Sequence, residues 1–344
     1  MRGILISEPA PGIFMIRQNG LLKAMPPVNI YVIPGKNGLI YDAGYGNRAA
    51  LDQLAAGLRR IKAICRKRSL PFNITRIIPS HSHPDHFSGL VKIRKRFGTA
   101  IVLTEEMAGI LRSKESYNKT YQGQGSGKFY FPASPLKRVL ADYSAQYIEQ
   151  LFDRFYLSGF IPSPDMVIKA PSTIRINHRQ WEVFPSPGHC QDHISLYDPK
   201  AGILFSGDNV LRTVTPWLGP PRSSLAQYVK TLETLLELPG LKLILAAHGS
   251  PVTEPKKRIR ELIEWRQQRI ASTREIIEKS GPKGVTLSQL LKTLYRGKGR
   301  DKLFLAEGWV RLTLDHLMET NVIKSFLYNK QLRFSINRSS GAPL

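Results

Sequence analysis

I-T-R-I-I-P-S-H-S-H-P-D-H-F-S-G-L, residues 74–90, joins a short apolar run to a polar run rich in potential metal ligands. The apolar half has the length and the isoleucine content of a buried β-strand. The polar half supplies four ligand-type side chains: His81, His83, Asp85 and His86. Imidazole and carboxylate are usual ligands of zinc, and such crowding is unfavourable without a cation to organise it. The stretch therefore predicts a strand that leads into a metal-binding loop.

The spacing inside this loop predicts two metal ions rather than one. His81 and His83 are separated by one residue, so both can point to the same side of the loop. Asp85 and His86 are adjacent and can reach a second ion on the other side. Each ion then needs further ligands from other parts of the chain.

Three later turns supply candidates for these ligands, and each turn follows an apolar run typical of a strand. P-G-H-C contains His189, S-G-D-N contains Asp208, and A-A-H-G contains His248. A single histidine near a turn is more often a hydrogen-bonded structural residue than a ligand. Three ligand-type residues at three strand ends, added to the loop at 81–86, favour a shared metal centre instead.

Predicted strands and helices alternate through the rest of residues 1–253. Apolar runs predict strands at 12–17, 28–33, 38–42, 74–80, 99–104, 173–177, 181–186, 194–198, 202–208 and 241–247. Helical periodicity predicts helices at 48–69, 91–98 and 223–238. Sheet and helix followed by sheet and helix again predict an α/β fold, a four-layer helix–sheet–sheet–helix sandwich.

Two segments depart from this alternation. Residues 113–165 begin with a run rich in glycine and tyrosine, and 135–156 has the pattern of an amphipathic helix. This insertion either covers the site as a lid or packs as a surface excursion without a catalytic part. The C-terminal segment predicts a basic connecting helix at 254–280, then helix, helix and hairpin in 281–344. That order predicts a small winged-helix domain after a catalytic domain of residues 1–253.

The chain is strongly basic, with 50 Lys and Arg against 26 Asp and Glu and a net charge of +24. Such a field attracts nucleic acid, anionic lipid or phosphate-bearing small molecules, although it is also compatible with a solvated surface that has no such partner. Cys65 and Cys190 are far apart, which excludes a disulfide framework and a cysteine-based zinc site. The N-terminus has no signal-peptide pattern and no run is long enough to span a membrane, so we expect a cytoplasmic protein.

The motifs H-S-H-P-D-H, P-G-H, G-D and H-G, preceded by L-I-Y-D-A-G, resemble those of the metallo-beta-lactamase-fold hydrolases over residues 10–255. The resemblance implies the αββα sandwich of that family and a metal centre with defined ligand sets. His81, His83 and His189 would hold the first ion. Asp85, His86 and His248 would hold the second, and Asp208 would bridge the two. Asp42 would be a structural residue beneath the site, and Cys190 a small buried residue.

Two divalent cations, about 3.5–4 Å apart, lower the pKa of a bridging water so that hydroxide is available near neutral pH. The resemblance therefore implies a hydrolase that uses this hydroxide as nucleophile, with Asp85 as the catalytic residue that handles the leaving group's proton. Zn²⁺ is the expected metal, with Fe or Mn as alternatives. No serine or cysteine nucleophile is required.

The motif P-G-H-C-Q-D-H-I-S-L, the basic helix and the terminal domain resemble the glyoxalase-II-like proteins and the beta-lactamase-like protein 2 subgroup. The resemblance favours a small, anionic acyl substrate, a thioester, ester or lactone. The alternative is an endoribonuclease for single-stranded RNA, which the charge and the terminal domain support. A DNA regulator is disfavoured, because the candidate recognition helix at 304–320 carries Glu307, Asp315 and Glu319. A homodimer stays open.

Overall fold

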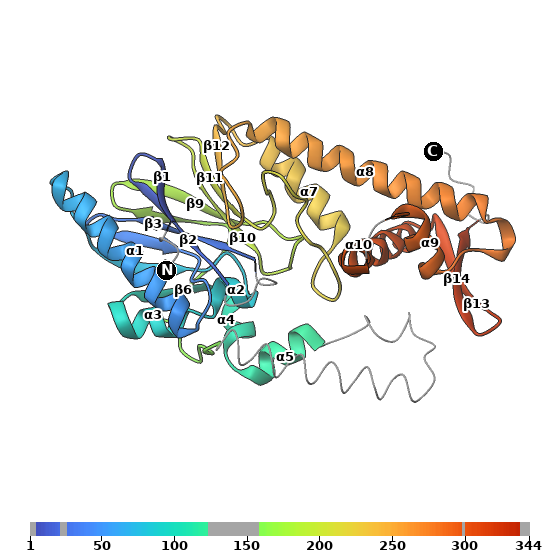
Figure 1. The fold of residues 1–344 in the computed structure, drawn as a ribbon, viewed down its shortest axis with the longest axis horizontal. Helices are drawn as coiled ribbons and strands as arrows, with labels where there is room; N and C mark the ends of the chain where they lie inside the picture. Colours follow the sequence, from blue (N-terminus) through green and yellow to red (C-terminus); the bar gives the residue numbers. More distant parts are fainter. Residues whose placement is uncertain (1–4, 21–25, 123–157, 298–299, 338–344) are drawn as a thin grey trace.

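The computed structural model describes residues 5–20, 26–122, 158–297 and 300–337 (Figure 1). Within them, one sheet has seven strands in chain order: β1 (Leu5–Ala10), β2 (Ile13–Gln18), β3 (Val28–Ile33), β4 (Gly38–Tyr41), β5 (Ile74–Ile78), β6 (Ala100–Thr104) and β7 (Met166–Ile168). Strands β1 to β4 pair antiparallel, and β4 to β7 pair parallel. The strands predicted at 12–17, 28–33 and 38–42 are confirmed as β2, β3 and β4, which pair antiparallel in that order.

The described residues of this half of the chain form five helices: α1 (Arg48–Lys67), α2 (Pro84–Phe87), α3 (Leu90–Phe97), α4 (Glu105–Leu111) and α5 (Lys114–Gln122). The side chain of Asn47 caps α1 by accepting a hydrogen bond from the backbone N–H of Ala50. The apolar stripe of α1 is buried, and the helix packs on β2, where Gly57 lies against Ile16. The helix predicted at 135–156 lies outside the described residues.

The second described sheet has five strands in the order β12-β11-β10-β9-β8. Their bounds are β8 (Ser172–Ile176), β9 (Arg179–Pro185), β10 (Ile194–Asp198), β11 (Ile203–Gly207) and β12 (Leu243–Ala246). Only β11 and β12 pair parallel, so both sheets are mixed. The predicted α/β fold with two sheets is therefore confirmed.

Side chains alternate between the two faces of a strand, and both faces are buried along β10, β11 and most of β12, whereas one face of β8 and β9 is largely exposed. Leu196, Phe205 and Leu245 belong to the apolar core shared with the first sheet. The neighbouring residues Tyr197, Leu204 and Ile244 pack instead with α7 (Leu225–Leu236) and α8 (Pro255–Lys279). Helices thus cover the outer face of β10, β11 and β12, while the first sheet covers the inner face of the second sheet.

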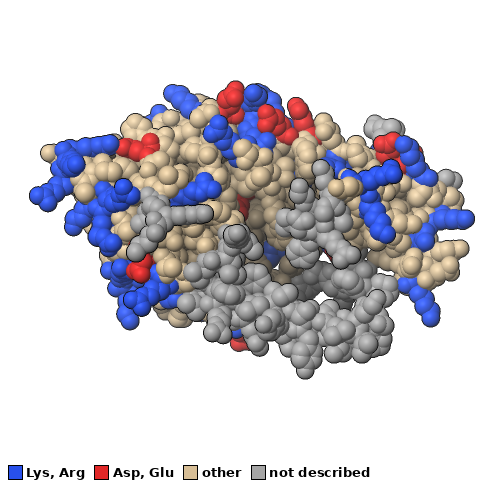
Figure 2. Space-filling model, in the orientation of Figure 1, with Lys and Arg blue, Asp and Glu red and all other residues tan. Residues whose placement is uncertain are grey.

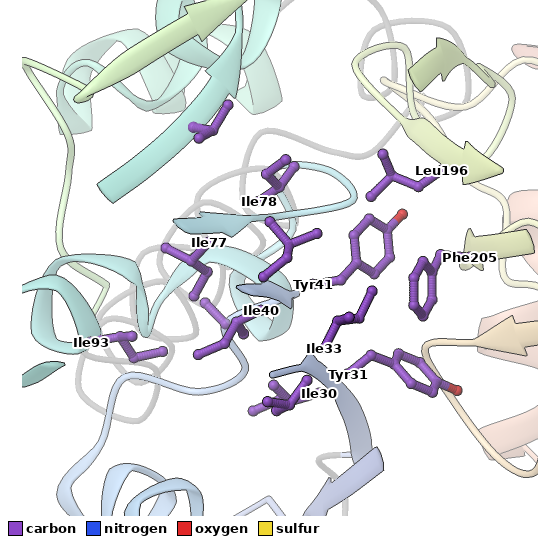
Figure 3. Close-up of a cluster of buried hydrophobic side chains, with 14 of the residues drawn as sticks. Ile30, Tyr31, Ile33, Ile40, Tyr41, Ile77, Ile78, Ile93, Leu196 and Phe205 are labelled. Carbon is purple, nitrogen blue, oxygen red and sulfur yellow. The ribbon is translucent and has the colours of Figure 1, made fainter. Parts of the chain in front are cut away.

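Aromatic rings join the two sheets (Figure 3). Phe205 of β11 stacks on Tyr41 of β4 with ring centroids 4.9 Å apart. Within the second sheet, Phe205 also stacks on Trp181 of β9, with ring centroids 5.2 Å apart. Two tyrosine hydroxyls then cross to the second sheet. The hydroxyl of Tyr31 donates to the carbonyl of Ala246 (2.7 Å), and that of Tyr41 donates to the carbonyl of Ile194 (3.0 Å). These bonds fix strand ends of one sheet against the other.

The C-terminal unit follows α8, which runs from the sandwich to this unit in Figure 1. It consists of a 3₁₀ turn (Gly281–Lys283), α9 (Leu287–Leu294), α10 (Arg300–Glu319), β13 (Ile323–Tyr328) and β14 (Gln331–Ile336). The predicted order of helix, helix and hairpin is confirmed. Trp309 of α10 packs in the same cluster as Tyr228 of α7 and Leu262 of α8, so the unit is joined to the sandwich by an apolar core.

None of the helices in the described part of the chain is long and apolar enough to cross a membrane.

We predict that Phe205→Ala lowers the free energy of unfolding by about 3–5 kcal/mol, because the substitution leaves a cavity between the two sheets. Leu327→Ala is the control, because Leu327 is 74% exposed and its truncation should change stability by less than about 0.5 kcal/mol. Urea unfolding followed by fluorescence measures both. Equal effects of the two substitutions would contradict the description of the core.

Candidate metal centre

The structure brings all seven predicted ligands to one edge of the sandwich. The loop at 81–86 follows β5, and the three other residues lie just outside strands of the second sheet. Their ligand atoms form groups in which every atom lies within 4.8 Å of the others. The groups among the described residues are His81 with His189 and Asp208, Asp85 with His86 and His248, and His81 with His83 and Cys190.

The imidazole nitrogens of His81, His83 and His189 face one another. The Nε2 atoms of His81 and His189 each lie 2.8 Å from Nδ1 of His83. The other ring nitrogen of His189, Nδ1, lies 2.7 Å from the carbonyl oxygen of Trp217. A carbonyl can only accept, so Nδ1 of His189 carries the proton, and its Nε2 lone pair points into the group.

The second group combines two histidines with a carboxylate. The two oxygens of Asp85 lie 3.6 Å from Nε2 of His86 and 3.5 Å from Nε2 of His248. The Nδ1 atom of His248 donates to the carbonyl of Pro27 (2.7 Å), so its Nε2 also faces the site. This is the arrangement in which an outer acceptor orients a metal-binding imidazole.

Asp208 lies between the histidines His81, His83 and His189 and the set formed by Asp85, His86 and His248. Its Oδ2 is 3.4 Å from Nε2 of His189 and 3.7 Å from Nε2 of His86, and its Oδ1 is 3.3 Å from Nε2 of His248. The carboxylate therefore touches histidines of both sets, which is the position that a bridging ligand requires. Among the described residues, Oδ1 of Asp208 and Nε2 of His86 are buried without a hydrogen-bond partner.

Asp42 lies beneath the site and is fully buried. One carboxylate oxygen accepts a hydrogen bond from the backbone N–H of Ser80 (2.7 Å), and the other lies 3.2 Å from Nδ1 of His86. It thereby holds the start of the ligand loop and orients His86, with its Nε2 toward Asp85 and Asp208. The structural position implied by the family resemblance is confirmed.

Charge divides the histidines into two sets. Burial and neighbouring histidines lower the pKa of His81 and His83, that of His83 to about 3, so both rings are neutral. Burial acts to lower the pKa of His86 and His248 as well, but nearby carboxylates outweigh it and raise both, that of His248 to about 10. Burial raises the pKa of Asp85, yet the charge of His86 and contact with His248 lower it to about 2.

These residues fit a cation site. The neutral imidazoles offer lone pairs, while the carboxylates of Asp208, which is buried, and Asp85, which is partly buried, are balanced by protons on His86 and His248. Divalent cations bind deprotonated ligands and would replace those protons. An acceptor-rich, buried set of imidazole and carboxylate groups is typical of zinc and related metals.

Two residues that follow His189 in the sequence, Asp192 and His193, support the site and were not predicted. Asp192 accepts a hydrogen bond from the backbone N–H of Ser82 (2.8 Å) and pairs with Arg222 (3.3 Å), so it anchors the ligand loop. His193 stacks on His81 at 5.1 Å, and its Nε2 accepts from the backbone N–H of Asp208 (3.2 Å). The stretch H-C-Q-D-H, residues 189–193, places these two ionisable residues three and four positions after His189, and this spacing could have predicted that they support the site.

Cys190 is buried, as predicted, and burial raises the pKa of its thiol well above the ordinary value. Its sulfur nevertheless lies close to ligand atoms of His81 and His83. The sequence did not predict this proximity. Tyr121 of α5 also reaches the loop, since its hydroxyl lies 2.8 Å from the hydroxyl of Ser82.

Residues 25–248 match the model of the metallo-beta-lactamase superfamily. The chain belongs to this superfamily, and its clusters of histidine and aspartate make it a metal-dependent hydrolase of that family.

A relative named "Probable metallo-hydrolase YqjP" from Bacillus subtilis (strain 168) is 24% identical over 315 residues, which cover 88% of this chain and 91% of that protein. A hydroxyacylglutathione hydrolase from Chromohalobacter salexigens is 35% identical over 89 residues, only 34% of its own length. A beta-lactamase domain protein from Burkholderia ambifaria has a TM-score of 0.74 at 17% identity, with 96% of this chain and 93% of that chain covered. The last likeness concerns the fold alone.

We predict that Zn²⁺ binding to the metal-free protein strengthens as pH rises. The pKa values of His86 and His248 are raised by folding, so their protons stabilise the metal-free fold below about pH 6.5. That contribution is lost as pH rises through the raised values, about 10 for His248. Each proton displaced by the metal makes the apparent affinity rise about tenfold per pH unit between pH 6.5 and 9. Calorimetry in buffers of different ionisation enthalpy counts these protons, and pH-independent binding without proton release would contradict the assignment.

Proposed function

We propose that the chain is a dinuclear metal hydrolase of a small acyl substrate, a thioester, ester or lactone. His81, His83 and His189 would hold one divalent cation, Asp85, His86 and His248 would hold the other, and Asp208 would bridge them. Zn²⁺ suits this nitrogen-rich set, with Fe or Mn as alternatives. The observation that carries the proposal is the carboxylate of Asp208, which lies within 3.7 Å of histidines from both groups.

A pair of divalent cations supplies a nucleophile at neutral pH and polarises the scissile bond. The protein's own residues prepare the site for this chemistry. The carbonyls of Trp217 and Pro27 fix the tautomers of His189 and His248. Asp85 is partly accessible and stays ionised, so it is the residue we assign to receive and return the proton of the leaving group.

Two observations support an acyl substrate. The local similarity to hydroxyacylglutathione hydrolases reaches 32–38% identity in three proteins, each over less than 100 residues. In addition, residues 309–314 of α10 are all buried, so this part of the helix has no exposed face that could enter a groove of a nucleic acid. We therefore propose that residues 281–344 form a winged-helix-like domain with a structural role, attached to the catalytic domain by α8.

The second candidate is an endoribonuclease for single-stranded RNA. The net charge of +24 favours it, and Figure 2 shows Lys and Arg gathered at both ends of the molecule. Polyanion binding releases counterions, so RNA cleavage should weaken steeply as salt rises, whereas hydrolysis of a small acyl substrate should change little.

We predict that His83→Ala lowers the amount of bound zinc and reduces turnover at least about 10³-fold, because it removes a ligand that faces both His81 and His189. His178→Ala is the matched control, since His178 lies in the turn between β8 and β9 and outside these ligand groups. The readouts are metal content by mass spectrometry and turnover of S-acylglutathione, acyl-coenzyme A, a lactone and single-stranded RNA.

Turnover of an acyl substrate by the unaltered protein, lost in His83→Ala and kept in His178→Ala, supports the proposal. Turnover of RNA alone, with steep salt dependence, would transfer the assignment to the nuclease. Full activity of a metal-free His83→Ala protein would overturn the metal mechanism itself.

A further inference from the structure

The loop between β11 and α7 sets the orientation of His189. This loop begins with Asp208 and contains Trp217, whose carbonyl accepts the hydrogen bond from Nδ1 of His189 at 2.7 Å. Ser223, near the end of the loop, donates from its hydroxyl to the backbone carbonyl of His189 (2.6 Å). The direction in which Nε2 of His189 points therefore depends on where the loop lies.

Two arginines of α8 hold this loop by its carbonyl oxygens. Arg258 donates from Nε to the carbonyl of Leu211 (2.8 Å) and from Nη2 to the carbonyl of Val214 (2.9 Å). Arg266 donates from Nη2 to the carbonyl of Pro216 (3.4 Å), the residue directly before Trp217. Helix α8 lies outside residues 25–248, the part of the chain that matches the superfamily model.

Helix packing alone does not explain why an arginine occupies position 266, because burying its charge costs desolvation free energy. The side chain of Arg266 is 1% exposed, and among the described residues no carboxylate is one of the groups that act on its charge. Its guanidinium instead packs against the rings of Trp265, Trp309 and Tyr228. Burial lowers the pKa of Arg266 to about 8, which reflects the cost of desolvating this charge. An apolar side chain would fill the same place at lower cost.

What an apolar side chain lacks is a donor for the carbonyl of Pro216. A guanidinium held between aromatic rings keeps its donors in a fixed plane, and weak hydration makes Arg suitable for such a buried position. Arg258 supplies two further bonds to the same loop from eight positions earlier in α8. Together the two side chains bond to three carbonyls between Asp208 and Trp217.

We infer that Arg258 and Arg266 are positioning residues for the metal centre. They hold the loop at 211–216, which places the carbonyl of Trp217 against Nδ1 of His189 and so directs Nε2 of His189 toward His83, where a metal ion would bind. The C-terminal helix thereby contributes to the affinity of a site whose ligands all lie before residue 249. This inference rests on the proposed role of His189 as a metal ligand.

The test compares Arg266→Met with Arg269→Met in the full chain. Methionine keeps much of the apolar volume but has no donor. Arg269 also packs on Trp265 and belongs to α8, yet it bonds to Leu294 in the C-terminal unit and not to the loop. Zinc affinity is measured by competition with a chromophoric chelator, and the thermal midpoint reports the integrity of the fold.

We expect Arg266→Met to weaken binding of one of the two zinc ions by about 10- to 100-fold, as loss of an outer-shell contact does. The thermal midpoint should stay the same or rise, because a buried charge has been replaced by an apolar group. Arg269→Met should leave both zinc affinities unchanged. In metal-free protein, nitrogen-15 NMR of the histidine rings should show faster exchange of the His189 Nδ1–H in Arg266→Met, which a packing role alone would not produce.

Arg258→Met provides the second variant, since Arg258 lies nearer the surface, with 17% of its side chain exposed, and its loss should weaken the same ion if Arg266→Met does not fold. Zinc affinity and His189 exchange that match the unaltered protein, in a folded variant, would overturn the inference. If the unaltered protein binds no zinc, the proposed function itself fails, so the two failures are distinguishable.

Discussion

The carboxylates of Asp85 and Asp208 and five imidazoles share one small volume at the edge of the sandwich, and the need of the two carboxylates for a neighbouring positive charge governs how the site is built. Asp85 and Asp208 can stay ionised there only beside a cation. Without metal, protons on His86 and His248 supply that charge, while His81 and His83 stay neutral with their lone pairs directed inward. A pair of divalent cations satisfies both requirements at once, which is why the set makes chemical sense as a metal centre.

The fold keeps these groups in place from behind. Asp42 orients His86, and the carbonyls of Pro27 and Trp217 orient His248 and His189. The hydroxyls of Tyr31 and Tyr41 tie the strands that carry the ligands to the first sheet. Rigidity at the strand ends and in the outer contacts is what holds ligands from distant parts of the chain within bonding reach of one another.

The sequence predicted the sandwich and the convergence of the seven candidate ligands because both leave local signals. Apolar runs mark the strands, and ligand-type residues follow strands at 81–86, Asp208 and His248. Strand β1 was missed because Ser7, Glu8 and Pro9 interrupt its pattern, which an edge strand tolerates. The contacts that support the site were missed for a different reason. The carbonyl of Trp217 and the carbonyls bound by the arginines of α8 are backbone atoms, which tertiary packing brings close to their partners. The type of a residue does not predict a contact of its backbone carbonyl.

The most direct test of the central claim is diffraction from crystals of the zinc-loaded protein at the zinc absorption edge. The account predicts two anomalous peaks about 3.5–4 Å apart, on either side of the Asp208 carboxylate, one beside His189 and the other beside His248. An absence of anomalous signal between these side chains, or a density map in which His189 or His248 turns away from the loop at 81–86, would contradict it.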